Sequence, residues 1–143
     1  MAAAPDTRAR PVMHAALADA WAALGDPSDD DLLAEAHHRV RSDLDTIDRA
    51  QFDRLGRAGR VCLDQGSWGE AAEYLRAVAG LADRFGLDRR ERAWLDYRLG
   101  RALHQNQEPE AARDCFERAG AAAADVGDAP LECRALGAIA RQV

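Results

Sequence analysis

An internal repeat with a period of about 40 residues restricts the fold of this chain more than any other sequence feature. In each copy a glycine is followed by an alanine and then by a large apolar residue at the same two distances: Gly59, Ala71 and Leu75, then Gly100, Ala112 and Phe116. Small residues let two helices approach closely, and the large residue fills the space toward the next pair. A repeat of this length predicts stacked helix pairs that together bury one continuous core.

The composition supports an all-α fold. Alanine is by far the commonest residue of the chain, and valine, isoleucine and threonine together are fewer than leucine alone. Alanine and leucine favour helices, whereas β-branched residues favour strands. The length of 143 residues suits one compact domain with a substantial core.

Apolar spacing and turn residues divide the chain into seven expected helices. Residues 1–11 are rich in Ala, Pro and Arg and are expected to form a disordered tail. Residues 12–49 are expected to form an N-terminal helical pair, either a degenerate repeat or a cap, with helices at 12–24 and from 29 to about 48. Residues 50–143 are expected to form repeats that end in a capping helix. Gly66, Gly86 and Gly127 mark turns in this part of the chain.

Helix starts are marked by residues that can bind free backbone N–H groups. Ser28 precedes three aspartates, and Asp48 or Thr46 is placed to begin the third helix. The segments Ser67–Glu70 and Asp88–Glu91 both have the spacing of a capping box, and Pro109 suits a first helical position.

These features resemble the tetratricopeptide repeat, whose motif combines Leu-Gly in a first helix with a small residue and an aromatic in the second. The resemblance covers about residues 51–143, and it is carried most closely by the stretch Gly66–Leu75. The period near 40 rather than 34 is typical of long-period bacterial members. Asp96 stands where the motif has tryptophan, and the closing proline is absent. The resemblance implies a short α-solenoid of antiparallel helix–turn–helix units.

Charge and cysteine content exclude several functional classes. The formal net charge is −6, which argues against nucleic-acid partners because these need a basic surface. Three cysteines without Cys-x-x-Cys spacing indicate a reducing, cytoplasmic setting. No apolar run approaches the length of a membrane-spanning helix, so no membrane association is expected.

No residue pattern indicates catalysis or cofactor binding, so no catalytic residue, metal or cofactor is expected. All 19 basic residues are arginine, which excludes lysine Schiff-base chemistry. Glu35 and His38 have the Glu-x-x-His spacing of di-iron bundles, but that site needs a second such unit. We interpret this segment as a solvated charged face. We interpret Cys62 as a buried packing residue.

The resemblance implies a concave surface, lined by the first helix of each pair, that binds peptides. Transferring the register places nine residues there: Arg60, Asp64, Trp94, Tyr97, Arg101, His104, Gln105, Arg134 and Arg141. Arg60, Arg101 and Arg141 occupy equivalent positions in successive repeats, and guanidinium groups bind carboxylates through paired hydrogen bonds. The aromatic residues suit anchoring of a partner. The family's dicarboxylate-clamp set of lysine and asparagine is absent, so an acidic chain terminus is not implied as the ligand.

Two classes of function, and a third option, remain open on these observations. The leading expectation is a protein-interaction adaptor that binds an acidic or amphipathic peptide segment in the groove. The second is a small helical enzyme or accessory subunit that recognises a precursor peptide, for which a groove acid or His104 would need a perturbed pKa. The third is self-association, for example a homodimer through the C-terminal helix, which lacks a second helix of its own repeat.

Overall fold

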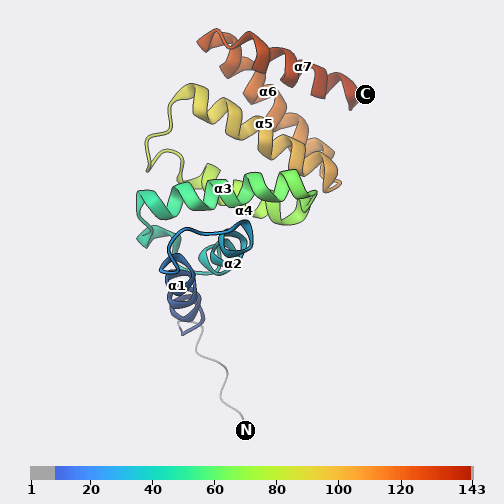
Figure 1. Cartoon of the computed structure of the whole chain (residues 1–143). Coiled ribbons are helices and arrows are strands. Elements are labelled where there is room, and N and C mark those ends of the chain that lie inside the picture. The colour runs from blue at the N-terminus through green and yellow to red at the C-terminus, as the bar shows by residue number, and fades with distance from the viewer. Residues whose placement is uncertain (1–8, 143) are drawn as a thin grey trace.

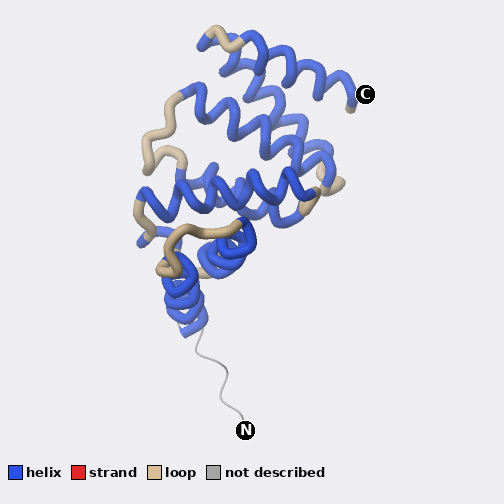
Figure 2. Tube along the Cα trace, in the orientation of Figure 1, coloured by secondary structure: helices blue, strands red, loops and turns tan. Residues whose placement is uncertain are grey.

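The computed structural model describes residues 9–142, and within these residues it contains helices and loops but no strand (Figure 2). In this part of the chain seven α-helices and one short 3-10 helix follow in order: α1 (Ala9–Ala22), α2 (Asp29–Arg39), η1 (Leu44–Thr46), α3 (Arg49–Gln65), α4 (Trp68–Leu81), α5 (Arg89–Gln105), α6 (Pro109–Val126) and α7 (Ala129–Arg141).

The helices pack in chain order, so the molecule is a short helical solenoid. Figure 1 shows the stack running from α1 at one end to α7 at the other. Each helix packs against its neighbours in sequence, and α5 also contacts α3 and α7. The first helices of the three repeats therefore lie beside one another, which confirms the predicted all-α architecture.

The repeat register places a glycine of each first helix against the large apolar residue of the second. A Cβ atom on Gly59 would lie 2.7 Å from Leu75 Cδ2, and one on Gly100 would lie 2.7 Å from Phe116 Cε1. Ala71 is completely buried in the first pair. Glycine therefore lets α3 approach α4, and α5 approach α6, without displacing the large apolar side chain.

The turns repeat with the same period as the core. Gly66 and Gln107, within the two pairs, both have positive φ angles, of 77° and 62°. Gly86 and Gly127, at the ends of the pairs, have φ angles of 65° and 71°. At all four turns two consecutive backbone N–H groups bond to carbonyls of the residues just before the turn.

Several predicted boundaries need correction. Helix α1 begins at Ala9, so residues 9–11 of the expected tail are helical, while residues 1–8 and Val143 lie outside the described residues. Helix α2 ends at Arg39 and does not continue to about residue 48. The Ser42 hydroxyl donates to the Arg39 carbonyl at 2.6 Å, and Asp43 caps η1. Such short polar side chains compete with the helical hydrogen bonds of the backbone.

The predicted helix starts are confirmed, including Pro109 as the first residue of α6, but one predicted capping box, at Ser67–Glu70, does not form. Ser28, Asp48 and Asp88 each accept a hydrogen bond from the third helical N–H in a complete capping box. Ser67 makes no side-chain cap bond. The Glu70 carboxylate instead accepts a weak hydrogen bond from the Cys62 thiol at 3.9 Å.

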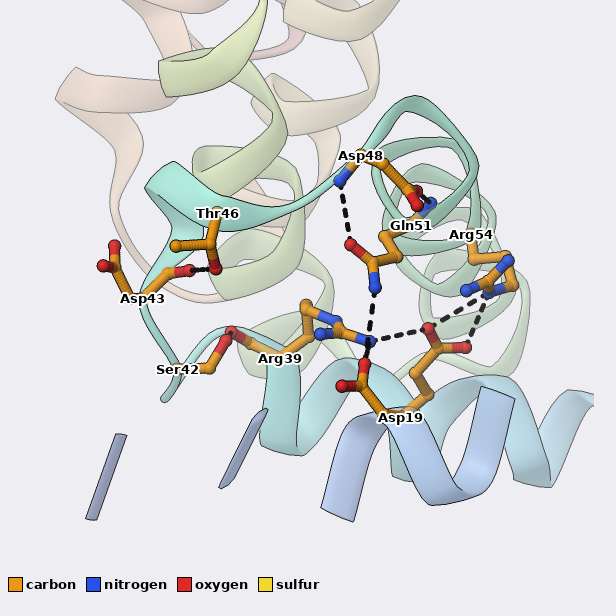
Figure 3. A network of polar contacts seen from close by, with 9 residues as sticks. Asp19, Arg39, Ser42, Asp43, Thr46, Asp48, Gln51 and Arg54 are labelled. Atoms are coloured by element: carbon orange, nitrogen blue, oxygen red, sulfur yellow. Dashed lines mark hydrogen bonds and ion pairs between the residues drawn. The ribbon is translucent and has the colours of Figure 1, made fainter. Parts of the chain in front are cut away.

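A buried ion-pair network joins the N-terminal helices to α3. Glu35 on α2 is 3% exposed and accepts hydrogen bonds from Arg54 on α3 and Arg39 on its own helix. Asp19 on α1 accepts hydrogen bonds from Arg39 at 2.9 Å and from Gln51 at 3.3 Å. Figure 3 shows Asp19, Arg39, Gln51 and Arg54 converging between these helices. The position and orientation of α1 therefore depend on charge pairing as well as on apolar packing.

Candidate functional site

The nine residues predicted to bind a peptide lie on three helices. Arg60 and Asp64 lie on α3, Arg134 and Arg141 lie on α7, and the other five lie on α5. Because these are the first helices of successive repeats and α5 contacts both α3 and α7, the residues share one side of the stack. We call this side the first-helix face.

The first-helix face contains a cleft between α3 and α5, with a volume of about 460 Å³. This value lies within the range of small-molecule sites. Apolar side chains from α3, α4 and α5 line its floor: Phe52, Leu75, Val78 and Leu95. Arginines also line it, among them Arg57, Arg60 and Arg98. Its lining includes no residue of α1 or α2, so the N-terminal pair does not occupy it.

A second cleft of about 270 Å³ lies between α5 and α7. It brings together five of the nine predicted residues: Tyr97, Arg101, His104, Gln105 and Arg141. Trp68, at the start of α4, also lines this cleft, although the sequence analysis did not select it. The Gln142 side chain lies 3.3 Å from the His104 ring and so joins the end of α7 to α5.

Two predicted residues, Asp64 and Arg134, line neither cleft. Asp64 is exposed toward the end of α3. The Arg134 guanidinium lies 5.5 Å from the centre of the Trp94 ring, and Arg98 lies 5.4 Å from the same ring. The remaining predicted residues line at least one of the clefts.

Trp94 holds its neighbours in place rather than presenting a free aromatic surface. Its indole N–H donates to the Asp128 carboxylate at 3.1 Å, and Tyr97 packs edge-on against its ring. Two guanidinium groups stacked on one indole gain cation–π stabilisation. Trp94 thereby positions Arg98 at the cleft.

Most arginines that line the clefts have no carboxylate in ion-pair contact, whereas most other described arginines have one. We define the cleft arginines as those lining either cleft with no carboxylate in ion-pair contact among the described residues: Arg57, Arg60, Arg98, Arg101 and Arg141. Elsewhere ion pairs are common, and Arg76–Glu108, Arg89–Asp125 and Arg113–Glu117 are examples.

Two cleft arginines, Arg57 and Arg98, were missed by the sequence analysis. The repeat could have identified them, because Arg57 and Arg98 are separated by the same number of residues as Gly59 and Gly100. Each also lies three positions before a predicted arginine, Arg60 or Arg101, and residues three apart share a helix face. Applying the repeat period to every arginine would have found both.

The cleft arginines influence one another electrostatically. Burial, and then the positive charges of Arg60 and Arg101, lower the pKa of Arg98, while Asp64 acts in the opposite direction. Arg98 is half-buried, and no hydrogen bond joins its guanidinium to another described residue. A bound anion would relieve this repulsion.

The carboxylates that line the α3–α5 cleft already have partners. Asp53 pairs with Arg49 at 3.0 Å, and Glu91 accepts the backbone N–H of Asp88 in the capping box of α5. Both side chains are exposed. Neither resembles the desolvated acid that general acid–base catalysis commonly uses.

The pair Glu35 and His38 is not the solvated charged face that the sequence indicated. Glu35 is buried because two arginines neutralise it, and His38 is half-buried with its Nδ1 atom 3.0 Å from that of His14. Burial, and then the neighbouring His37, His14 and Arg41, lower the pKa of His38. Within residues 9–142, no group of three His, Cys, Asp or Glu side chains is arranged to hold a metal ion.

The three cysteines are free, and only Cys133 is exposed. Burial, and then the neighbouring Glu70, raise the pKa of Cys62 to about 11. A thiol of this kind is a packing residue and a poor nucleophile near neutral pH, as the sequence predicts.

None of the helices between residues 9 and 142 has the length and apolar character needed to span a bilayer. No family model, curated protein or solved structure matches this chain. The resemblance to tetratricopeptide repeats therefore depends on the residues and the repeat register alone.

Proposed function

We propose that this protein is an interaction module that binds an acidic or amphipathic peptide segment on its first-helix face. The observation that carries the proposal is the set of five cleft arginines without carboxylate partners, in a chain of net charge −6. A protein with excess acid can pair its arginines internally, so an unpaired group on one face favours an external anion.

The two clefts supply complementary interactions for such a segment. The guanidinium groups can bind carboxylates through paired hydrogen bonds, which set orientation and accelerate association. The apolar floor of the α3–α5 cleft, which includes Leu75 and Val78, can take an apolar side chain and contribute affinity. An extended segment crossing α3, α5 and α7 would contact both clefts.

The state of the cleft carboxylates favours binding over catalysis. A site for acid–base chemistry commonly holds an acid that is shielded from solvent. Asp53 and Glu91 are instead exposed and engaged in local contacts. The proposal extends to a tetratricopeptide-type adaptor in a bacterial cytoplasm, for which the three free cysteines provide support.

A second candidate function is self-association through α7. Leu136 on this helix is 56% exposed, so it offers an apolar contact for a second copy of the chain. Light scattering would detect a dimer, and Leu136→Glu would dissociate it if this surface forms the contact. A concentration-independent monomer would exclude this candidate.

Peptide binding on the first-helix face can be tested with a fluorescent peptide of alternating glutamate and apolar residues. We expect the wild-type protein to bind it and a triple variant, Arg60→Gln, Arg101→Gln and Arg141→Gln, to lose at least about tenfold in affinity. The matched control is Arg76→Gln, Arg89→Gln and Arg113→Gln, because it removes the same charge from residues with carboxylate partners. Circular dichroism would check that all three proteins are equally helical.

The comparison between the two triple variants decides the outcome. Equal loss in both would mean that net charge, and not the clefts, controls binding. Retention of binding in the cleft variant would remove these arginines from the mechanism. A glutamine version of the peptide should bind weakly to every protein.

A further inference from the structure

The α3–α5 cleft combines two features that a carboxylate peptide does not fully explain. It has an apolar floor of a size that suits a small molecule, and its lining contains five arginines against two carboxylates. Two of those arginines have carboxylate partners, Arg49 with Asp53 at 3.0 Å and Arg90 with Asp128 at 3.8 Å. Arg57, Arg60 and Arg98 remain without one among the described residues.

The positions of these three arginines converge on the cleft from two helices. Arg57 and Arg60 are three positions apart on α3, so they share a helix face. Arg98 comes from α5 on the other side and is supported by the Trp94 indole. The like charge of Arg60 contributes to the lowered pKa of Arg98, which indicates that the two helices bring positive charges close together.

A single carboxylate offers two acceptor oxygens to the donors of three guanidinium groups, and Glu91, which also lines the cleft, is held by its capping box. A phosphate monoester carries close to two negative charges at neutral pH, since its second pKa is about 6, and offers three acceptor oxygens. Guanidinium groups match phosphate geometry through paired hydrogen bonds. Phe52, Val78 and Leu95 would meanwhile contact an apolar body attached to the phosphate.

From this geometry we infer that the α3–α5 cleft is a binding site for a phosphate monoester carried on an apolar or aromatic body. The phosphate binds Arg57, Arg60 and Arg98, and the body occupies the floor. This site goes beyond the proposed peptide function, because it recognises the phosphate ester itself. The ester can belong to a free metabolite or to a phosphorylated side chain, which share the same chemistry.

Phenyl phosphate is a minimal probe of the site. Titration into the isotopically labelled full chain, followed by NMR, should shift amide signals of α3 and α5 and give a dissociation constant. Inorganic phosphate has the charge without the body, and benzoate has the body with one charge. We expect both to bind at least about tenfold more weakly than phenyl phosphate.

Two variants with matched controls localise the site. Arg98→Gln should weaken phenyl phosphate about tenfold or more, whereas Arg113→Gln, in an ion pair outside the cleft, should not. Gly56→Leu should block the floor, because Gly56 lines the cleft and a Cβ there meets nothing within 4 Å. Gly80→Leu places the same side chain at another open helical position and should leave binding unchanged.

Each result bears directly on the inference. The absence of saturable phenyl phosphate binding, or binding retained in both Arg98→Gln and Gly56→Leu, would overturn it. Equal affinity for benzoate would overturn the preference for a dianion, and equal affinity for inorganic phosphate would overturn the role of the apolar floor.

A phosphotyrosine pentapeptide distinguishes the two sources of the ester. Tighter binding of the peptide than of phenyl phosphate would assign the ester to a protein partner, and equal binding would assign it to a small molecule. Acidic-peptide binding without phenyl phosphate binding would reject this inference while leaving the proposed function intact. The reverse result would reject the proposed function alone.

Discussion

The close approach of α3 to α4 at Gly59 makes a quantitative prediction about stability. An alanine Cβ there would lie 2.7 Å from Leu75 Cδ2 and 2.8 Å from Cγ. Carbon atoms in favourable contact lie about 3.5–4.0 Å apart, so the leucine or the helix would have to move by about 1 Å. Overpacking of this kind costs about 1–3 kcal/mol.

The higher helix propensity of alanine partly offsets this overpacking cost. Alanine is better than glycine in a helix interior by about 1 kcal/mol, so Gly59→Ala should destabilise the protein by a net of about 0–2 kcal/mol. The same helix contains its own control, since a Cβ on Gly56 would meet nothing within 4 Å. Gly56→Ala should therefore stabilise by about 1 kcal/mol.

Urea unfolding followed by circular dichroism would measure both variants. The free energies of unfolding should differ by about 1–3 kcal/mol, because the helix contribution cancels between them. Gly100→Ala should be at least as damaging as Gly59→Ala, since the clash there is with the rigid Phe116 ring. If Gly59→Ala proves as stabilising as Gly56→Ala, the close-packing explanation of the repeat is wrong.

Four further predictions concern a turn, the buried network and two cysteines. Gln107→Gly should raise the free energy of unfolding by about 1 kcal/mol, because Gln107 has a φ of 62° that costs an L-residue energy; an unchanged urea midpoint would contradict this. Glu35→Ala should cost about 1.5–3 kcal/mol and speed amide exchange in α2, because it removes the charged hydrogen bonds of Arg54 and Arg39, while Asp19→Ala, whose side chain is 62% exposed, should cost about 1 kcal/mol or less. Cys62 should stabilise the fold fully below pH 9.0 and progressively less as pH rises toward its folded pKa of about 11, because the unfolded thiol loses its proton first; a Cys62→Ala variant should show a shallower loss over this range. In a thiol-reagent assay at pH 8, exposed Cys133 should react well before Cys62, and equal rates would show that the core opens readily.

Most of the fold was predictable from local patterns. The caps at Asp48 and Asp88, the turn at Gly127 and the first helical position of Pro109 depend on neighbouring residues only, and all are present. The helix start at Ser67 was predicted correctly but its capping box was not, and the Glu70 carboxylate contacts the Cys62 thiol of another helix instead. The end of α2 was missed because an apolar stripe continued past residues whose side chains terminate the helix.

The candidate site was only partly predictable. The repeat register correctly placed Arg60 and Arg101 on first helices, because a residue's helix face follows from its position in the sequence. It did not show which arginines lack carboxylate partners, because those partners come from other helices, as with Arg76 and Glu108 on neighbouring repeats. It placed Trp94 on the first-helix face but did not show that Asp128 and two guanidinium groups contact its side chain.

The sequence by itself determined the helices, their order and the repeat unit, since these follow from local propensity, capping and spacing. Only the tertiary structure decided which charges are neutralised and where space remains. The local sequence does not show that Glu35 is buried or that Arg98 lacks a carboxylate partner. Burial and ion pairing depend on how the helices pack against one another. The clefts arise for the same reason: their volume is what the side chains of α3, α4, α5 and α7 leave unfilled.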